Sequence, residues 1–164
     1  ISGVKLIEAL RNEYGKDYIA LMPTNLYGPG DNYDLNTSHV LPAMIRKFHE
    51  AKQNNTDVTI WGTGTPLREF LHVDDLANAV LFCLENEMED HLYNIGSGEE
   101  LTILELANLV SKIVGFNGSI LLESTKPDGT PRKLLNSNKI KKKGFKSSIP
   151  LEEGIKSTYL NYIS

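Results

Sequence analysis

Cysteine is nearly absent from this 164-residue chain, and its single thiol, Cys83, excludes an intrachain disulfide and fits a reducing, cytoplasmic setting. Long apolar runs are also missing, since none approaches the roughly 20 residues that a transmembrane helix needs. Basic residues are not in excess, because 17 Lys and Arg stand against 21 Asp and Glu and give a formal net charge of −4. We therefore expect no membrane partner and no nucleic-acid partner.

The short motifs of several enzyme classes are missing as well. Neither G-x-G-x-x-G nor G-x-x-x-x-G-K-[ST] occurs, so the chain carries no complete phosphate-binding loop of either kind. No tyrosine is followed four residues later by lysine, and G-x-S-x-G, H-E-x-x-H and C-x-x-C are absent. Hydrolase and zinc-site interpretations therefore lack support, and we expect no bound metal.

What is present is the composition of a globular domain, with 40% hydrophobic and 23% charged residues. The chain begins with Ile1, and the segment through Tyr14 carries charges where a signal peptide would be apolar. We therefore expect it to be a fragment, a processed product or an upstream-truncated sequence of a longer polypeptide. Cys83, in a helical apolar stretch, is expected to be a buried small residue.

Helical and strand periodicities alternate along the chain, which predicts an α/β fold. The predicted helices cover 4–14 with Gly15 as C-cap, 38–53 capped by Ser38, 74–87 capped by Asp74, 102–114 opened by a T-x-x-E capping box, 137–144, and a last one after Pro150. The predicted strands cover 17–22, 58–61, 68–73, 93–95 and 119–123, and loops are predicted at 24–37 and 126–133.

Three segments resemble the C-terminal half of the extended short-chain dehydrogenase/reductases that act on nucleotide sugars. They are P-T-N-L-Y-G-P at 23–29, R-E-F-L-H-V-D-D at 68–75 and Y-N-I-G-S-G at 93–98. Within that superfamily the chain is most similar to the GDP-L-fucose synthase family. The discriminating stretches are S-H-V-L-P-A-M-I-R-K-F-H-E-A at 38–51, W-G-T-G-T-P-L-R-E-F at 61–70 and K-P-D-G-T-P-R-K at 126–133.

This resemblance implies an NADPH-dependent enzyme that converts GDP-4-dehydro-6-deoxy-D-mannose to GDP-L-fucose by epimerising C3 and C5 and then reducing the C4 ketone. It implies that 1–30 are the last elements of a Rossmann NADP-binding domain. Residues 31–164 would be mainly the nucleotide-sugar domain, with some segments returning to the Rossmann sheet. The family's Y-x-x-x-K motif would end just before Ile1. We expect the chain alone to be inactive, the full-length enzyme to be a homodimer, and the chain to self-associate or bind a complementary N-terminal half.

The resemblance also assigns roles to individual residues. His39 would be the acid of the epimerisation, close to the cofactor, since histidine can donate a proton near neutral pH. Cofactor contacts fall on the residues that follow a predicted strand, namely Pro23, Thr24, Asn25 and Leu26. Substrate contacts fall on Lys47, Trp61, Arg68 and Asp128, with Arg132 as a less specific addition.

Simpler interpretations stand beside these assignments. A histidine at a helix start can make a structural hydrogen bond, a lone Lys or Arg can be a solvated charge, and Trp61 can be a core residue. The whole chain could belong to another nucleotide-sugar epimerase or dehydratase, or be a non-catalytic nucleotide-sugar-binding or assembly module. The residues alone identify no side chain that would read the base.

Overall fold

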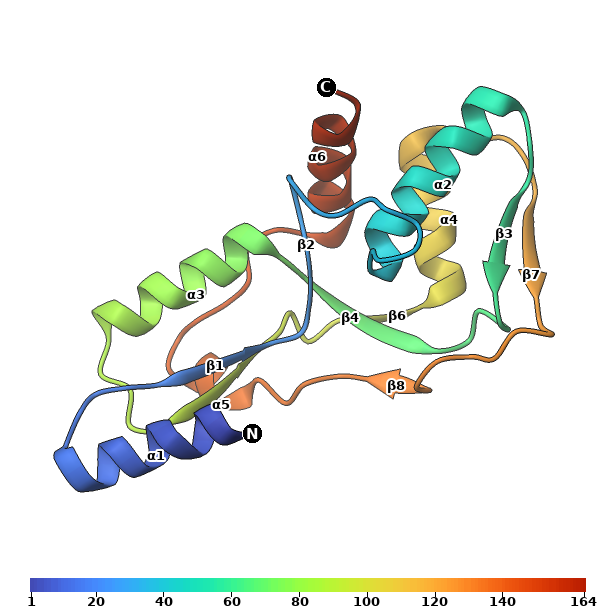
Figure 1. The fold of residues 1–164 in the computed structure, drawn as a ribbon. Coiled ribbons are helices and arrows are strands. Elements are labelled where there is room, and N and C mark those ends of the chain that lie inside the picture. The colour runs from blue at the N-terminus through green and yellow to red at the C-terminus, as the bar shows by residue number, and fades with distance from the viewer.

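The computed structural model describes residues 1–164 as a mixed α/β chain with two lobes joined by a long strand (Figure 1). In chain order its elements are α1 (Ser2–Tyr14), β1 (Ala20–Pro23), β2 (Asn25–Tyr27), α2 (Val40–Asn54), β3 (Val58–Trp61), β4 (Leu67–His72), α3 (Val73–Glu85), β5 (Leu92–Ile95), β6 (Glu100–Thr102), α4 (Ile103–Val114), β7 (Ile120–Glu123), β8 (Arg132–Lys133), α5 (Asn138–Lys142) and α6 (Leu151–Ile163). No helix combines the length and the apolar character needed to cross a membrane.

The first lobe is built on two parallel strands, β1 and β5, which pair from Ala20↔Leu92 to Pro23↔Ile95. Its apolar core draws on β4, β5, α3 and α5 and consists of Leu71, Ala79, Cys83, Met88, Tyr93, Ile95, Ile140 and Phe145. The expected burial of Cys83 is confirmed, and burial raises the pKa of its thiol. The parallel strands with helices beside them are Rossmann-like, as the sequence predicted.

In the second lobe α4 packs against both α2 and α6, and α2 contacts strand β3 of the parallel pair β3–β7 (Figure 1). Its larger core includes residues from each of these helices, such as Phe48, Leu106 and Ile155, which are fully buried. Leu151 and Tyr159 of α6 pack on this core beside Ile155, so these three residues form the buried face of the last helix. This packing of the helices in the core fixes the position of the first turns of α2.

Strand β4 connects the two lobes and is the central strand of a mixed sheet (Figure 1). It pairs with β2 in parallel, with β6 in antiparallel and with the two-residue β8 in parallel. Successive side chains of a strand point to opposite faces. Accordingly Phe70 enters the core of the second lobe, and Leu71 enters the core of the first.

Two predicted helix caps were wrong. Helix α2 has His39 rather than Ser38 at its N-cap position, and no side chain caps it. Helix α3 begins after His72, whose ring Nδ1 accepts a hydrogen bond from the backbone N–H of Asp74 at 3.2 Å. Asp74 therefore lies within the first turn instead of capping it.

Other end signals were correct. Gly15 adopts the left-handed conformation after α1, and Thr102 forms a complete capping box with Glu105. The sequence predicted none of the three shortest strands, β2, β6 and β8, and placed β2 and β8 in loops, because strands of two or three residues are too short to show a hydrophobic period.

Candidate functional site

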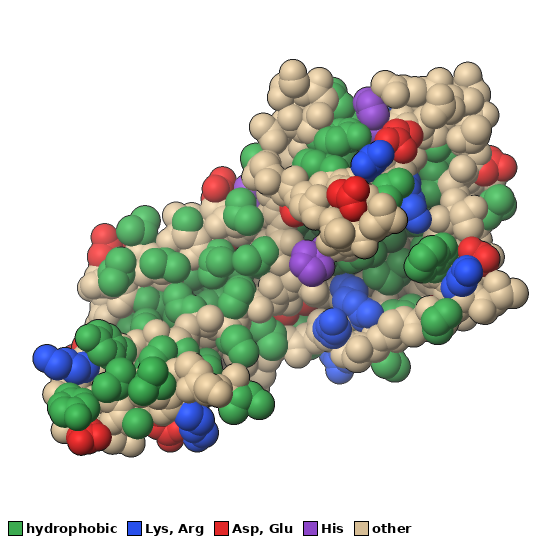
Figure 2. All heavy atoms as spheres, in the orientation of Figure 1, with side chains coloured by type: hydrophobic (Ala, Val, Ile, Leu, Met, Phe, Trp, Pro, Cys, Tyr) green, Lys and Arg blue, Asp and Glu red, His purple; other side chains and the backbone are tan.

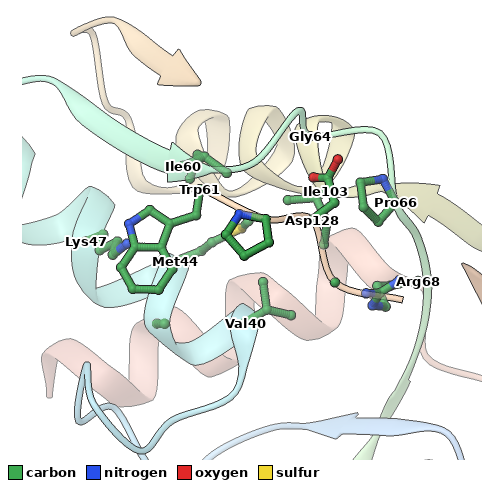
Figure 3. A pocket seen from close by; sticks show the side chains of 13 residues that line it. Val40, Met44, Lys47, Ile60, Trp61, Gly64, Pro66, Arg68, Ile103 and Asp128 are labelled. Carbon is green, nitrogen blue, oxygen red and sulfur yellow. The ribbon is translucent and has the colours of Figure 1, made fainter. Parts of the chain in front are cut away.

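A cavity of about 280 Å³ opens where α2, β3, β4 and the 126–131 segment meet (Figure 3). Thirteen residues line it, and they include four of the predicted substrate-binding residues, Lys47, Trp61, Arg68 and Asp128. In Figure 3, Trp61 and Lys47 lie at one side and Arg68 at the other, with Met44 and Val40 between them. Residues far apart in the sequence thus line one cavity.

Trp61 is a surface residue, with 66% of its area exposed at the end of β3. This exposure argues against the simpler interpretation of Trp61 as a core residue. The ammonium group of Lys47 lies 5.8 Å from the centre of the indole ring, within the range of a cation–π contact. The indole is therefore a flat apolar surface, free to receive a ligand and bordered by positive charge.

Arg68 is held by backbone carbonyls rather than by a carboxylate. Its Nη1 atom donates to the carbonyl of Leu67 at 2.7 Å and to that of Thr130 at 2.6 Å. Because only Nη1 makes these bonds, Nε and Nη2 keep their donors for a ligand. A guanidinium fixed in this way, with its charge uncompensated, is suited to phosphate oxygens.

Asp128 is bound to the turn between β3 and β4. Its Oδ1 accepts from the backbone N–H of Thr63 at 2.8 Å, and its Oδ2 accepts from the Thr63 hydroxyl at 2.7 Å. A Cβ atom at Gly62, whose φ is +82°, would come within 2.1 Å of Asp128 Oδ1. The turn therefore needs glycine at 62, and Asp128 fixes the edge of the cavity.

His39 directly precedes Val40, the first residue of α2 and part of the cavity wall. Its side chain is exposed and makes no capping bond to its own helix. The simpler interpretation, a structural hydrogen bond at a helix start, is therefore not what the structure shows. The imidazole makes no hydrogen bond within the chain.

The segment that carries His39 is fixed by its own turn. Asp34 Oδ1 accepts from the backbone N–H groups of Asn36 and Thr37 and from the Thr37 hydroxyl, each at 3.0 Å. These bonds lower the pKa of Asp34, with the Thr37 hydroxyl as the largest cause. The approach to α2 is thus set by local hydrogen bonds.

The predicted cofactor residues lie at the carboxyl end of β1, where ligands bind in open α/β sheets. Pro23, Thr24 and Asn25 line a hollow of about 330 Å³, whereas Leu26 packs on the core of the first lobe. The Thr24 hydroxyl and the Asn25 amide both donate to the carbonyl of Glu69, at 3.3 and 2.7 Å. The segment is therefore fixed in place without a ligand.

Arg132 lies apart from the cavity that the other four residues share. Its guanidinium forms a two-pronged ion pair with Glu100, with Nε–Oε1 at 2.8 Å and Nη2–Oε2 at 2.5 Å. This pair raises the pKa of Arg132 and lowers that of Glu100, mainly through the hydrogen bond between them. Arg132 is thus satisfied within the chain.

Several basic side chains gather beside the hollow where the two lobes meet on the face shown in Figure 2. Among the cavity residues, Lys47 and Arg68 are cationic and Asp128 is the one anion.

Sequence reasoning missed the apolar wall of the cavity, whose residues include Met44, Ile60 and Ile103. They carry only the ordinary signal of apolar residues in a helix or strand. No group of three or more His, Cys, Asp or Glu side chains is arranged to hold a metal ion.

The chain is similar in sequence to proteins named as GDP-L-fucose synthases. The chain is 55% identical over 164 residues to a probable GDP-L-fucose synthase 1 of Oryza sativa subsp. japonica, covering 99% of this chain and 50% of that protein. It is 48% identical to a GDP-L-fucose synthase of Escherichia coli strain K12, covering 97% of this chain and 53% of that protein. The chain thus spans about half the length of the curated relatives it matches.

Among solved structures, a GDP-6-OMe-4-keto-L-xylo-heptose reductase from C. jejuni superposes with a TM-score of 0.90 at 33% identity. That match covers 99% of this chain and 58% of the other. The model of the NAD dependent epimerase/dehydratase family matches residues 1–96. Because this match extends over more than half of the chain, the chain belongs to the NAD dependent epimerase/dehydratase family.

Proposed function

We propose that the chain supplies the substrate-binding part of an NADP(H)-dependent epimerase-reductase that converts GDP-4-dehydro-6-deoxy-D-mannose to GDP-L-fucose. One observation carries this proposal. Lys47, Trp61, Arg68 and Asp128 come from separate segments and line one cavity next to His39, in a chain 55% identical to a protein named as a GDP-L-fucose synthase.

The cavity would hold the diphosphate of a GDP-sugar. A nucleoside diphosphate presents anionic oxygens, and Arg68 directs unused donors from a fixed position while Lys47 adds a mobile charge. Trp61 gives a flat surface on which a ring can pack. Arg132, paired with Glu100, would act outside this diphosphate site.

His39 would act on the sugar ring. Epimerisation beside a ketone requires that a proton leave carbon on one face and that another arrive on the opposite face. A free imidazole at the start of α2 can deliver that second proton and is then reprotonated from solvent, because it is exposed. The base that removes the first proton would come from a segment outside these 164 residues.

The hollow at Pro23–Asn25 fits the nicotinamide end of the cofactor. It lies at the carboxyl end of β1, and its shape is set by the bonds of Thr24 and Asn25 to Glu69. When bound there, NADPH supplies the hydride that reduces the C4 ketone. The 164 residues contain no Gly-rich loop for the rest of the dinucleotide, so we propose that a further segment completes its site.

We also propose that this further segment is a complementary N-terminal half, and that the complete enzyme forms a homodimer. Strands β1 and β5 pair only with each other, so each keeps an open edge, and isolated two-stranded sheets are marginal. Helix α1 buries no residue, and the outer face of α3 exposes Leu81 and Leu84. Apolar surfaces of this kind are usually covered.

The site does not favour either alternative function, which would be another nucleotide-sugar epimerase or dehydratase, or a non-catalytic binding or assembly module. The K-P-D-G stretch, one of the segments that resemble the GDP-L-fucose synthase family, contributes Pro127, Asp128 and Gly129 to the cavity, and this favours that family over another nucleotide-sugar epimerase. The uncommitted imidazole of His39 is unnecessary in a purely binding or assembly module.

A chimaera tests the proposal. The N-terminal half of the rice relative would be joined to this chain before Ile1, and NADPH oxidation would be followed with GDP-4-dehydro-6-deoxy-D-mannose. We expect turnover in the chimaera, no turnover in the isolated chain, and loss of turnover but retention of GDP-fucose binding in a His39→Asn chimaera. Turnover by the isolated chain, or an active His39→Asn chimaera, would contradict the assignment.

A further inference from the structure

A second cavity, of about 460 Å³, adjoins the first at two shared lining residues. It lies between the middle of α2 and strand β3, and it shares Lys47 and Trp61 with the diphosphate cavity. A ligand whose diphosphate lies near Arg68 can therefore extend across Trp61 into this second space. The part of a nucleoside diphosphate that extends so far is the base.

One acidic residue faces this space without a partner. Trp61 and Glu123 are directly paired in the parallel register of β3 and β7, so their side chains stand on the same face of the sheet. Glu123 is half-buried, lines the second cavity, and has no hydrogen bond or ion pair at its carboxylate. The other acids of the cavity are occupied: Glu50 binds Arg46 at 2.7 Å, and Asp57 binds the backbone of Ser119 at 2.9 Å.

A basic residue lies on the same indole. The ammonium group of Lys126 is 5.6 Å from the centre of the Trp61 ring and forms no ion pair. Lys126 is placed by its backbone N–H, which donates to the carbonyl of Glu123 at 3.0 Å. Trp61 thus has an unpaired carboxylate on its cross-strand neighbour Glu123, which lines the second cavity, and an unpaired ammonium group near its ring on Lys126, which reaches the indole from outside the cavity lining.

This arrangement matches guanine. Guanine carries two acceptors, O6 and N7, on one edge, and it has donors at N1 and at the exocyclic N2. A carboxylate can accept from N1–H and N2–H together, a lysine can donate to O6 or N7, and an indole can stack on the purine. Uracil has one N–H between two carbonyl oxygens, so a carboxylate would accept one bond and face two electronegative oxygens.

From this placement we infer that Glu123, Lys126 and Trp61 read the guanine base, with Glu123 as the residue that sets the preference for guanine over uracil. The inference rests on the proposed nucleotide-sugar site, because it assumes that the diphosphate lies near Arg68. It adds to that proposal a reason, in this chain's own residues, for the base.

The chain contains one tryptophan, so its fluorescence reports directly on this surface. The experiment titrates the 164-residue chain with GDP, inosine diphosphate and UDP, and repeats each titration with Glu123→Gln. For the unchanged chain we expect quenching by GDP at the lowest concentration, then by inosine diphosphate, which lacks N2, and then by UDP. In Glu123→Gln, GDP affinity should fall roughly tenfold or more, and GDP and inosine diphosphate should become similar.

The sign of the change separates base reading from simple electrostatics. If Glu123 only repels the diphosphate, removing its negative charge should strengthen the binding of all three nucleotides alike. If Glu123 reads the base, Glu123→Gln should instead weaken the binding of GDP and leave the binding of UDP unchanged or slightly stronger. Glu50→Gln is the matched control in the same cavity, and it should keep the preference for GDP because Arg46 already occupies that carboxylate.

Three results would overturn the inference. The first is an unchanged ratio of UDP to GDP affinity in Glu123→Gln, and the second is an equal loss of preference in Glu50→Gln. If either occurs while GDP binding still depends on Arg68, the proposed function stands and only the base assignment fails. The third is the absence of any nucleotide effect on Trp61, which would reject the base assignment and the diphosphate site together.

Discussion

The side-chain amide of Asn25 donates a hydrogen bond to the carbonyl oxygen of Glu69 at 2.7 Å, and this bond joins the two halves of the candidate site. Asn25 belongs to the segment assigned to the cofactor, and Glu69 directly follows Arg68 in β4. A shift of one segment must therefore move the other.

The carboxylate of Glu69 should be essential for stability. It is fully buried, and its two oxygens accept from the backbone N–H groups of Gly98 at 2.7 Å and Leu135 at 3.2 Å. In Glu69→Gln, one oxygen becomes an amide that cannot accept, so a buried N–H loses its partner. We expect a loss of about 1–3 kcal/mol in the free energy of unfolding, measured with urea. Unchanged stability would show that these bonds contribute nothing.

Replacing Gly62 should damage both the fold and the site. In Gly62→Ala, a left-handed backbone conformation is imposed on alanine, at a cost of about 1–3 kcal/mol, and the new Cβ displaces Asp128. Gly30→Ala is the matched control, because Gly30 has a similar φ of +77° but open space around it. Both variants should lose stability in thermal unfolding, and only Gly62→Ala should also weaken GDP-fucose binding. Equal GDP-fucose binding by the two variants would show that Asp128 does not contribute to the site.

Acid should weaken the capping box of α4. The backbone N–H of Thr102, followed by its hydroxyl, holds the pKa of Glu105 below its ordinary value. A depressed folded-state pKa gives stability that is present above the unfolded value, about 4.3, and is lost as the pH falls through the folded value. Glu105→Gln should therefore show a shallower fall in unfolding free energy between about pH 5 and pH 3. Parallel pH profiles for the two proteins would exclude this contribution.

Arg68 and Arg132 should behave differently despite their similar chemistry. Arg68→Ala removes the guanidinium that points into the cavity and should abolish GDP-fucose binding. Arg132→Ala removes an ion pair with Glu100 at the protein surface, where solvent screening leaves such a pair little effect on stability. It should bind GDP-fucose as the unchanged chain does, measured by calorimetry. A large loss of affinity in Arg132→Ala would place that residue at the substrate.

Local signals in the sequence were sufficient for some of the fold. Gly15 and the Thr102–Glu105 pair define helix ends through contacts within three or four residues, so they can be read without a structure. His72 as a cap could not be read in this way, since histidine is not among the preferred N-cap residues. Strands β6 and β8 exist only because they pair with β4 over long sequence distances.

The same distinction applies to the site. Trp61, Arg68 and Asp128 were found because they lie in motifs that resemble a family, and the structure then brought them together. Glu123 carried no such signal. Its placement beside Trp61 depends on the register of β3 against β7, and register is a property of the folded sheet.

The most direct measurement is a calorimetric titration of the 164-residue chain with GDP-fucose and, separately, with UDP-glucose. The central claim is that the cavity at Trp61 and Arg68 binds a guanosine diphosphate sugar. It predicts that GDP-fucose binds, that UDP-glucose binds more weakly or not at all, and that Arg68→Ala removes the binding of GDP-fucose. Equal affinity for the two sugars, or GDP-fucose binding that survives in Arg68→Ala, would contradict it.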